Sequence, residues 1–181
     1  MTNRKLDEIR NLVLPVMRIL DLINLEEEEK LKQIPLGYIR KNATRMHAVC
    51  RFKPGPKGYK KTIEDVKEVA IHPEAVNEKW IHYAQFLMFH EYLHAIGNIR
   101  HDSIFRKLED LWPDERAKTA GKEFGRFLRN RAAKWLWTCP KCGKDVEEGI
   151  FAIGKNWHTE CFTCHHCSSP FDDQSPFYCR E

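Results

Sequence analysis

The sequence predicts an α+β protein, in which a mostly helical domain with a small antiparallel sheet precedes a small cysteine-rich module. Residues 4–24 place apolar side chains at helical spacing. Two apolar segments, 46–52 and 66–71, flank a loop rich in proline and glycine at 54–58, and this pattern is typical of two paired strands. Six of the seven cysteines lie between residues 139 and 179, which separates the last segment from the rest.

Helix signals dominate the middle of the chain. After a short helix expected at 26–34, a longer one is predicted over 78–96, with Asn77 as its N-cap and Gly97 as its left-handed stop. Asp102 or Ser103 can cap the next helix. A last helix is predicted from Pro113 to Trp137.

The composition predicts a folded, intracellular protein of two domains. Of the 181 residues, 42% are hydrophobic and 31% are charged, as in globular proteins. The longest apolar stretch, 12–25, contains Pro15 and two charged residues, so we expect no membrane partner. The N-terminus lacks a secretory pattern, which favours a cytoplasmic, nucleoid or nuclear location. Because the composition changes at Thr138, we expect domains over 1–137 and 138–181.

The most informative segment is the helical pair His90 and His94. Residues four apart on a helix lie about 40° apart around its axis, so the two imidazoles can share one metal ion. Glu91 lies about 100° from His90, where a carboxylate can contact water beside the metal. The competing interpretation is a core helix with two unrelated histidines.

Two histidines leave a zinc ion under-coordinated, so a third protein ligand is required. His101 is the best candidate, because the Gly97 stop lets the chain turn back toward the ion. Asp102 and Glu109 are weaker candidates. Three neutral imidazoles would leave one position open for water, with Glu91 as its general base. The chemistry expected is hydrolysis of a peptide bond.

The residues after the histidine pair extend the pattern to His-Asp-x-x-Phe-x-x-Leu, which starts at His101, and to Trp-Pro-Asp at 112–114. Over 35–115 the chain therefore resembles the SprT-like zinc metallopeptidases, whose relatives include the Spartan, WLM and YgjP-like proteins. The resemblance implies a zincin-like fold in 1–137, with one catalytic zinc ion. It also implies a protein substrate, with DNA-bound or DNA-crosslinked proteins as candidates. The residues it assigns are the ligands His90, His94 and His101 and the general base Glu91.

A metzincin is the nearest competing family. Its third histidine would fall at Arg100, one residue before His101. Metzincins also need a methionine turn after the motif, whereas the last methionine of this chain is Met88. Both observations exclude this family.

The cysteine-rich segment is typical of zinc sites, since its Cys-x-x-Cys pairs and histidine occur without an export signal. Its spacing, with neighbours Trp157 and Phe162, resembles a LIM domain. The resemblance implies a protein partner and one structural zinc ion held by Cys139, Cys142, His158 and Cys161. A second structural zinc ion would use Cys164, Cys167 and Cys179, with Glu181 as the first candidate for the fourth ligand. Other candidates are His166, Asp173 and the terminal carboxylate.

The net charge of +4 is unevenly distributed. Residues 40–61 contain eight lysines or arginines and no acid, and residues 116–134 contain seven against one glutamate. Such patches attract polyphosphate, although a solvated face is the competing explanation. DNA is therefore a candidate partner. An alternative function is a non-catalytic nucleic-acid-binding or adaptor protein with zinc-stabilised modules. The candidate nucleic-acid contacts are Arg51, Lys53, Lys57, Lys60, Lys61, Arg126 and Arg129.

Overall fold

The computed structural model describes residues 3–56, 59–132, 135–137 and 177–179. The chain divides into two compact units, Met1–Phe124 and Gly125–Glu181. The predicted domain boundary after residue 137 falls inside the second unit and stays a prediction. No helix in these described ranges is long and apolar enough to cross a membrane.

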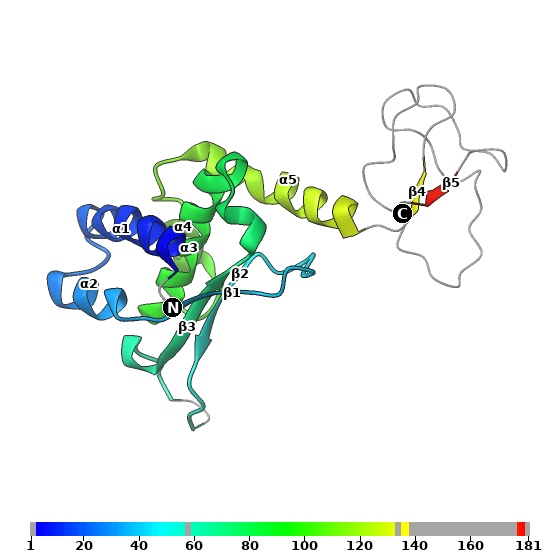
Figure 1. Ribbon diagram of the computed structural model, residues 1–181. Helices are drawn as coiled ribbons and strands as arrows, with labels where there is room; N and C mark the ends of the chain where they lie inside the picture. Colours follow the sequence, from blue (N-terminus) through cyan, green and yellow to red (C-terminus); the bar gives the residue numbers. More distant parts are fainter. Residues whose placement is uncertain (1–2, 57–58, 133–134, 138–176, 180–181) are drawn as a thin grey trace. The chain divides into compact units, whose positions relative to one another are not determined.

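The first unit is built around a three-stranded sheet in the order β1-β3-β2 (Figure 1). β2 (Ala48–Phe52) and β3 (Val66–Ile71) pair antiparallel, as the two apolar segments predict. β1 (Leu36–Tyr38) pairs with β3 in parallel. The prediction of an antiparallel sheet was therefore incomplete, because a three-residue strand is too short to show a period of two. The sheet is mixed, and β2 forms one of its edges.

Two N-terminal helices precede the sheet. α1 (Arg4–Ile19) buries the apolar stripe predicted from the sequence and contains Pro15. It ends before residue 24 because Asp21 adopts a positive φ of 54°. α2 (Leu25–Lys32) begins with a capping box between Asn24 and Glu27.

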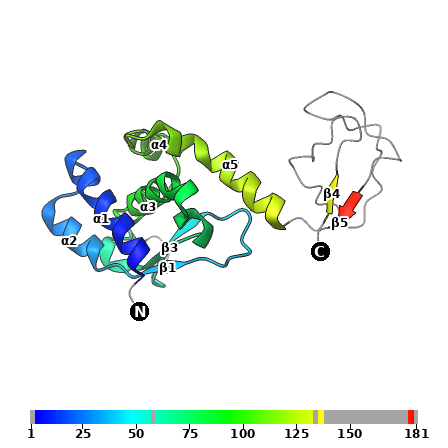
Figure 2. The same cartoon turned by 45° about the horizontal axis from the view of Figure 1, so that its top comes forward.

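The central helix is α3 (Ile81–Ala95), which carries the His90–His94 pair. Most of its side chains are buried, and it packs against α1 and the strands β2 and β3 (Figure 2). It starts later than predicted because Asn77 leads first into a short 3₁₀ turn, η3 (Glu78–Trp80), which follows η2 (Pro73–Val76). The predicted end of the helix at a left-handed glycine is confirmed, since Gly97 has a φ of 102°.

Two further helices follow in the chain, and the second of them continues past Phe124 into the second unit. α4 (Ser103–Glu109) is capped by Asp102, whose side chain accepts hydrogen bonds from the backbone of Ile104 and Phe105, as predicted. α5 (Glu115–Ala132) inserts Phe124 among the rings of His47, His72, Trp80 and Tyr83, at centroid distances of 5.0, 5.6, 5.2 and 5.4 Å.

The prediction of a helix reaching Trp137 was wrong. α5 ends at Ala132, and Trp135–Trp137 forms β4, which pairs antiparallel with β5 (Phe177–Cys179). The two tryptophans favour a strand, because aromatic side chains pack well on a pleated surface. The helical spacing of 115–132 does not extend through them.

Candidate metal centre

Three histidines converge at the end of α3, as the sequence predicts. The Nε2 atom of His101 lies 3.0 Å from Nε2 of His90 and 3.0 Å from Nε2 of His94. One ring nitrogen from each histidine can thus face a common point, with all three atoms within 4.8 Å of one another. Two ligands come from one face of α3 and the third from the loop between Gly97 and α4.

A single buried ring supports all three imidazoles. The centroid of Phe105 lies 4.9 Å from that of His90 and 4.7 Å from those of His94 and His101. Phe105 is 1% exposed, so the rings rest on a fixed apolar base. The cap at Asp102 fixes the first turn of α4 and with it the position of Phe105.

The outer nitrogens of two histidines are already committed. Nδ1 of His90 lies 2.7 Å from Oε1 of Glu109, and Nδ1 of His94 lies 2.7 Å from the carbonyl oxygen of Asn98. Both partners are acceptors, so each Nδ1 donates a hydrogen bond. Each Nε2 must then present a lone pair to the centre, which is the tautomer that binds metal.

This arrangement fits a zinc ion. Nε2 of His101 can carry at most one proton, so it can satisfy only one of its two 3.0 Å contacts with the lone pairs of His90 and His94, whereas a cation between the rings satisfies all three nitrogens. Nitrogens that share one tetrahedral zinc ion lie about 3.3 Å apart, close to the separations here. The candidate ligands are His90, His94 and His101.

The electrostatics favour neutral, ligating imidazoles. Burial lowers the pKa of His94, and the neighbouring histidines lower it further against the opposing effects of Asn98 and Glu109. The pKa of His101 is lowered by partial desolvation, with His90 and Arg106 adding to the effect. A histidine must lose its proton to bind a metal, so both shifts favour metal binding near neutral pH.

Glu91 is buried beside the histidines, with 5% of its surface exposed. Burial raises its pKa to about 7, while the charge of His90 and a hydrogen bond from the backbone of Cys50 act in the opposite direction. Cys50 lies in the edge strand β2, so this hydrogen bond ties the carboxylate to the sheet. Burial also raises the pKa of the Cys50 thiol to about 12, so the thiol stays neutral.

Glu109 is not a candidate ligand in this structure, although the sequence left it as an alternative. Its carboxylate bridges His90 and Arg106, each at 2.7 Å. Burial alone would raise its pKa, but the hydrogen bonds from these two residues outweigh it and hold the pKa near 2. Asp102, the other alternative, is the N-cap of α4.

Replacing Glu109 by glutamine should weaken zinc binding at the centre by about 10–100-fold. The charged carboxylate that accepts the hydrogen bond from His90 and orients its ring becomes a neutral amide. Chelator competition measures this affinity. The exposed Glu115 provides the control, since Glu115→Gln removes the same charge from the start of α5. An unchanged affinity in Glu109→Gln would show that the bond to His90 does not position the ring.

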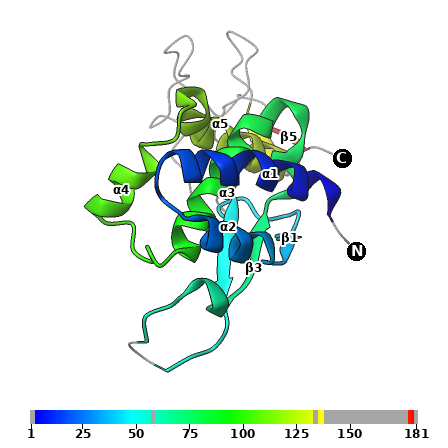
Figure 3. The same ribbon diagram turned by 90° about the vertical axis from the view of Figure 1, so that its left-hand side faces the viewer.

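The residues predicted to contact nucleic acid are partly engaged with the protein. Arg51 forms an ion pair with Glu68 at 2.6 Å, which reduces its charge toward an external ligand. Lys53, Lys60 and Lys61 lie in the β2–β3 connection, which projects beyond the sheet (Figure 3). Lys57 lies outside the described residues. Arg126 and Arg129 lie on α5 in the second unit.

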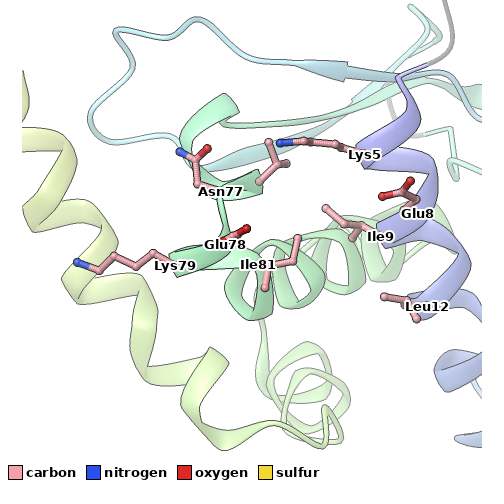
Figure 4. Close-up of a pocket in the computed structure, with 9 residues that line it drawn as sticks. Lys5, Glu8, Ile9, Leu12, Asn77, Glu78, Lys79 and Ile81 are labelled. Carbon is pink, nitrogen blue, oxygen red and sulfur yellow. The ribbon is translucent and has the colours of Figure 1, made fainter.

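A surface hollow of about 790 Å³ lies between α1 and the start of α3 (Figure 4). It is separate from the histidine centre, since none of the histidine ligands or Glu91 lines it. Its side chains carry charges of both signs and no histidine or cysteine. They are Lys5, Glu8, Ile9, Leu12, Val76, Asn77, Glu78, Lys79 and Ile81.

The residues that orient the candidate metal ligands could not be recognised from the sequence. Glu109 and Asn98 orient two ligands, yet a carboxylate 19 residues from His90 and a backbone carbonyl give no pattern of their own. Phe105 was noted only as part of a motif, and its contact with all three rings depends on the fold.

The predicted structural zinc ligands lie almost entirely outside the described residues. Of these ligands, only Cys179 lies within the described residues, in β5. The other seven are Cys139, Cys142, His158, Cys161, Cys164, Cys167 and Glu181.

Comparison with known proteins addresses this part of the chain. Residues 139–181 match the LIM domain family. The C-terminal segment is a LIM domain. LIM domains bind zinc through cysteine and histidine side chains, so zinc is the structural cofactor of this segment. They also mediate protein–protein interactions, consistent with the expected protein partner.

Curated relatives agree with this assignment. Over 35 residues, or 18% of this chain, it is 46% identical to Cysteine-rich protein 3 of Mus musculus and of Homo sapiens. Over 32 residues it is 50% identical to Cysteine-rich protein 2 of Bos taurus. The matches span only 17%, 16% and 15% of these three proteins. No solved structure matches the chain. These similarities concern the LIM segment, so the metallopeptidase interpretation of the first unit stays a prediction.

Proposed function

We propose that the first unit is a zinc-dependent endopeptidase and that the LIM domain binds a protein partner. The observation that supports the first part is the convergence of three imidazole nitrogens next to a buried glutamate. A structural zinc site closes its coordination with four protein ligands, whereas a catalytic site keeps a position open. The described residues bring three candidate ligands together, which favours the catalytic type.

In this proposal Glu91 moves the proton. A bound zinc ion would supply a Lewis acid that acidifies water and polarises the scissile carbonyl. The Glu91 carboxylate accepts the proton of the attacking water and then donates it to the leaving amine. A pKa near 7 suits both steps at neutral pH, because the group can exist in either form. The Cys50 backbone and the packing of α3 hold the carboxylate in place.

The edge strand β2 provides a surface for an extended polypeptide. The backbone of His47 bonds to His72 of β3, and the register continues with Val49 opposite Ala70. The backbone groups of Ala48 and Cys50 therefore face away from β3, and of these the N–H of Cys50 already bonds to Glu91. Within the described part of the chain, no strand pairs with this outer edge. A substrate strand that pairs here would place its peptide bond next to Glu91, since Cys50 contacts that residue.

Proteolysis should depend on zinc. We expect the full-length protein to cleave an unfolded protein substrate, to lose this activity after treatment with a chelator, and to regain it when zinc is restored. Circular dichroism of the chelated protein checks that the first unit stays folded. Cleavage that persists after complete removal of zinc would contradict the proposal.

A second candidate function is a non-catalytic adaptor, and the LIM domain is the observation that favours it. In that case the histidine centre binds zinc only to stabilise the first unit. The two functions differ in a direct assay. An adaptor captures a partner through residues 139–181 and cleaves no protein in the presence of zinc, whereas the proposed peptidase cleaves its substrate.

A further inference from the structure

One end of the basic connection between β2 and β3 lies next to the C-terminal end of α3, which carries His94. The carbonyl oxygen of Lys61 is 3.6 Å from the position that a Cβ atom would take at Gly97. The amide of Gly97 in turn bonds to the carbonyl of His94 at 2.9 Å. One end of this connection therefore packs on the helical turn that carries a candidate metal ligand.

The lysines of this connection keep their charge available. Lys61 donates to the carbonyl of Lys53 at 2.9 Å, and Lys53 donates to the carbonyl of Glu64 at 2.7 Å. Each ammonium has three donors and gives one of them to a neutral acceptor in these bonds. The carboxylate of Glu64 pairs with Lys30 instead, at 2.9 Å. Lys60 is exposed beside them.

Aromatic rings complete this surface. The ammonium of Lys61 lies 6.0 Å from the ring centre of Phe52 and 5.9 Å from that of Tyr59. These contacts hold the lysine near the end of β2. Tyr59 is 52% exposed, so its ring can also contact a ligand.

Three contacts fix the direction of β2 relative to α3. Nδ1 of His47 lies 2.7 Å from the hydroxyl of Tyr83, near the start of each element. The backbone of Cys50 then bonds to Glu91. Lys61 reaches Gly97 at the far end. β2 and α3 therefore run in the same direction. Along this direction the lysines come after the position of Glu91, at the C-terminal end of β2.

In a polypeptide paired antiparallel with β2, the residues before the cleaved bond lie toward the C-terminal end of β2. These residues are therefore the ones closest to the lysines. Successive residues of a strand advance about 3.4 Å, so Lys53 lies about 10 Å beyond Cys50. The second to fourth substrate residues before the cleaved bond fall within reach of the lysine side chains. Antiparallel pairing is the more stable arrangement for an added strand.

We propose that Lys53, Lys60 and Lys61 form a subsite beside the edge strand β2 that selects acidic residues two to four positions before the cleaved bond. This inference rests on the proposed peptidase function and adds a substrate class to it. A peptide is favoured over nucleic acid as the ligand, because the lysines follow the C-terminal end of the edge strand β2 and the carbonyl of Lys61 lies next to the turn after His94.

The test compares two peptides that differ only at these positions, one with glutamates and one with glutamines. For the wild-type protein we expect kcat/KM to be about tenfold higher for the glutamate peptide. The variant Lys60→Glu/Lys61→Glu should lose or invert this preference. Lys60→Gln alone, at an exposed position, should reduce it and guards against misfolding of the double variant. A matched control, Lys5→Glu/Lys122→Glu, changes two exposed lysines outside the connection and should keep the preference.

Equal cleavage of both peptides by the wild type would overturn the inference and leave the peptidase proposal standing. Failure to cleave either peptide, or any unfolded protein, would overturn both. A double variant that keeps the peptide preference but loses binding to a fluorescent oligonucleotide would identify the connection as a nucleic-acid contact, against the inference.

Discussion

The variant Glu91→Gln should lose proteolytic activity while it keeps its fold and its zinc. Glutamine has nearly the same shape as glutamate but cannot accept the proton of the attacking water. General-base catalysis contributes about 10²–10⁴-fold to a rate, and we expect a loss of this size or larger. Because Glu91 is buried, the substitution also removes a group that costs energy to ionise, so the melting temperature should not fall much.

The measurement is the cleavage rate of an unfolded protein at saturating zinc, with zinc content determined on the same samples. Glu78→Gln is the matched control, because Glu78 is exposed at the start of η3 and precedes the same helix. It should cleave at the wild-type rate. If Glu91→Gln were as active as the wild type, Glu91 would not be the base and the mechanism would be wrong.

The variant His101→Ala should bind zinc at the first unit much more weakly than the wild type. Loss of a residue that only orients a ligand weakens metal binding by about 10–100-fold, so loss of a ligand should weaken it by more than about 100-fold. His101 is largely exposed, and its removal creates no cavity in the core. The first unit should therefore stay folded, and activity should be lost together with the metal.

Zinc counted after dialysis against a weak chelator measures this effect, with an expected loss of one ion per chain. His82→Ala provides the control, because His82 is exposed on α3 and its Nδ1 lies 3.2 Å from the carboxylate of Asp114, outside the histidine centre. It should keep every zinc ion. The same zinc content in His101→Ala and in the wild type would exclude His101 as a ligand.

Local patterns in the sequence predicted the core of the candidate centre. The four-residue spacing of His90 and His94 determines their common face on any helix. The glycine stop at Gly97 and the cap at Asp102 each depend on residues next to them in the chain, and the structure confirms both. The convergence of His101 with the pair follows from these two features, since together they set the path of the connecting loop.

Features that depend on distant residues could not be predicted in this way. The parallel strand β1 exists because its backbone bonds to β3, which lies about 30 residues later. The bond between Glu109 and His90 requires α4 to fold back onto α3. The pairing of Trp135–Trp137 with Phe177–Cys179 joins the two ends of a long segment. In each case the partner, rather than the local pattern, decides the structure.

The most direct test of the candidate centre is a crystal structure of the full-length protein with anomalous scattering recorded at the zinc absorption edge. We expect an anomalous peak about 2.0–2.1 Å from Nε2 of each of His90, His94 and His101, with no fourth protein ligand. Further peaks should lie among the cysteines of the LIM domain. Zinc peaks confined to residues 139–181, with well-ordered histidines and no metal between them, would contradict the account.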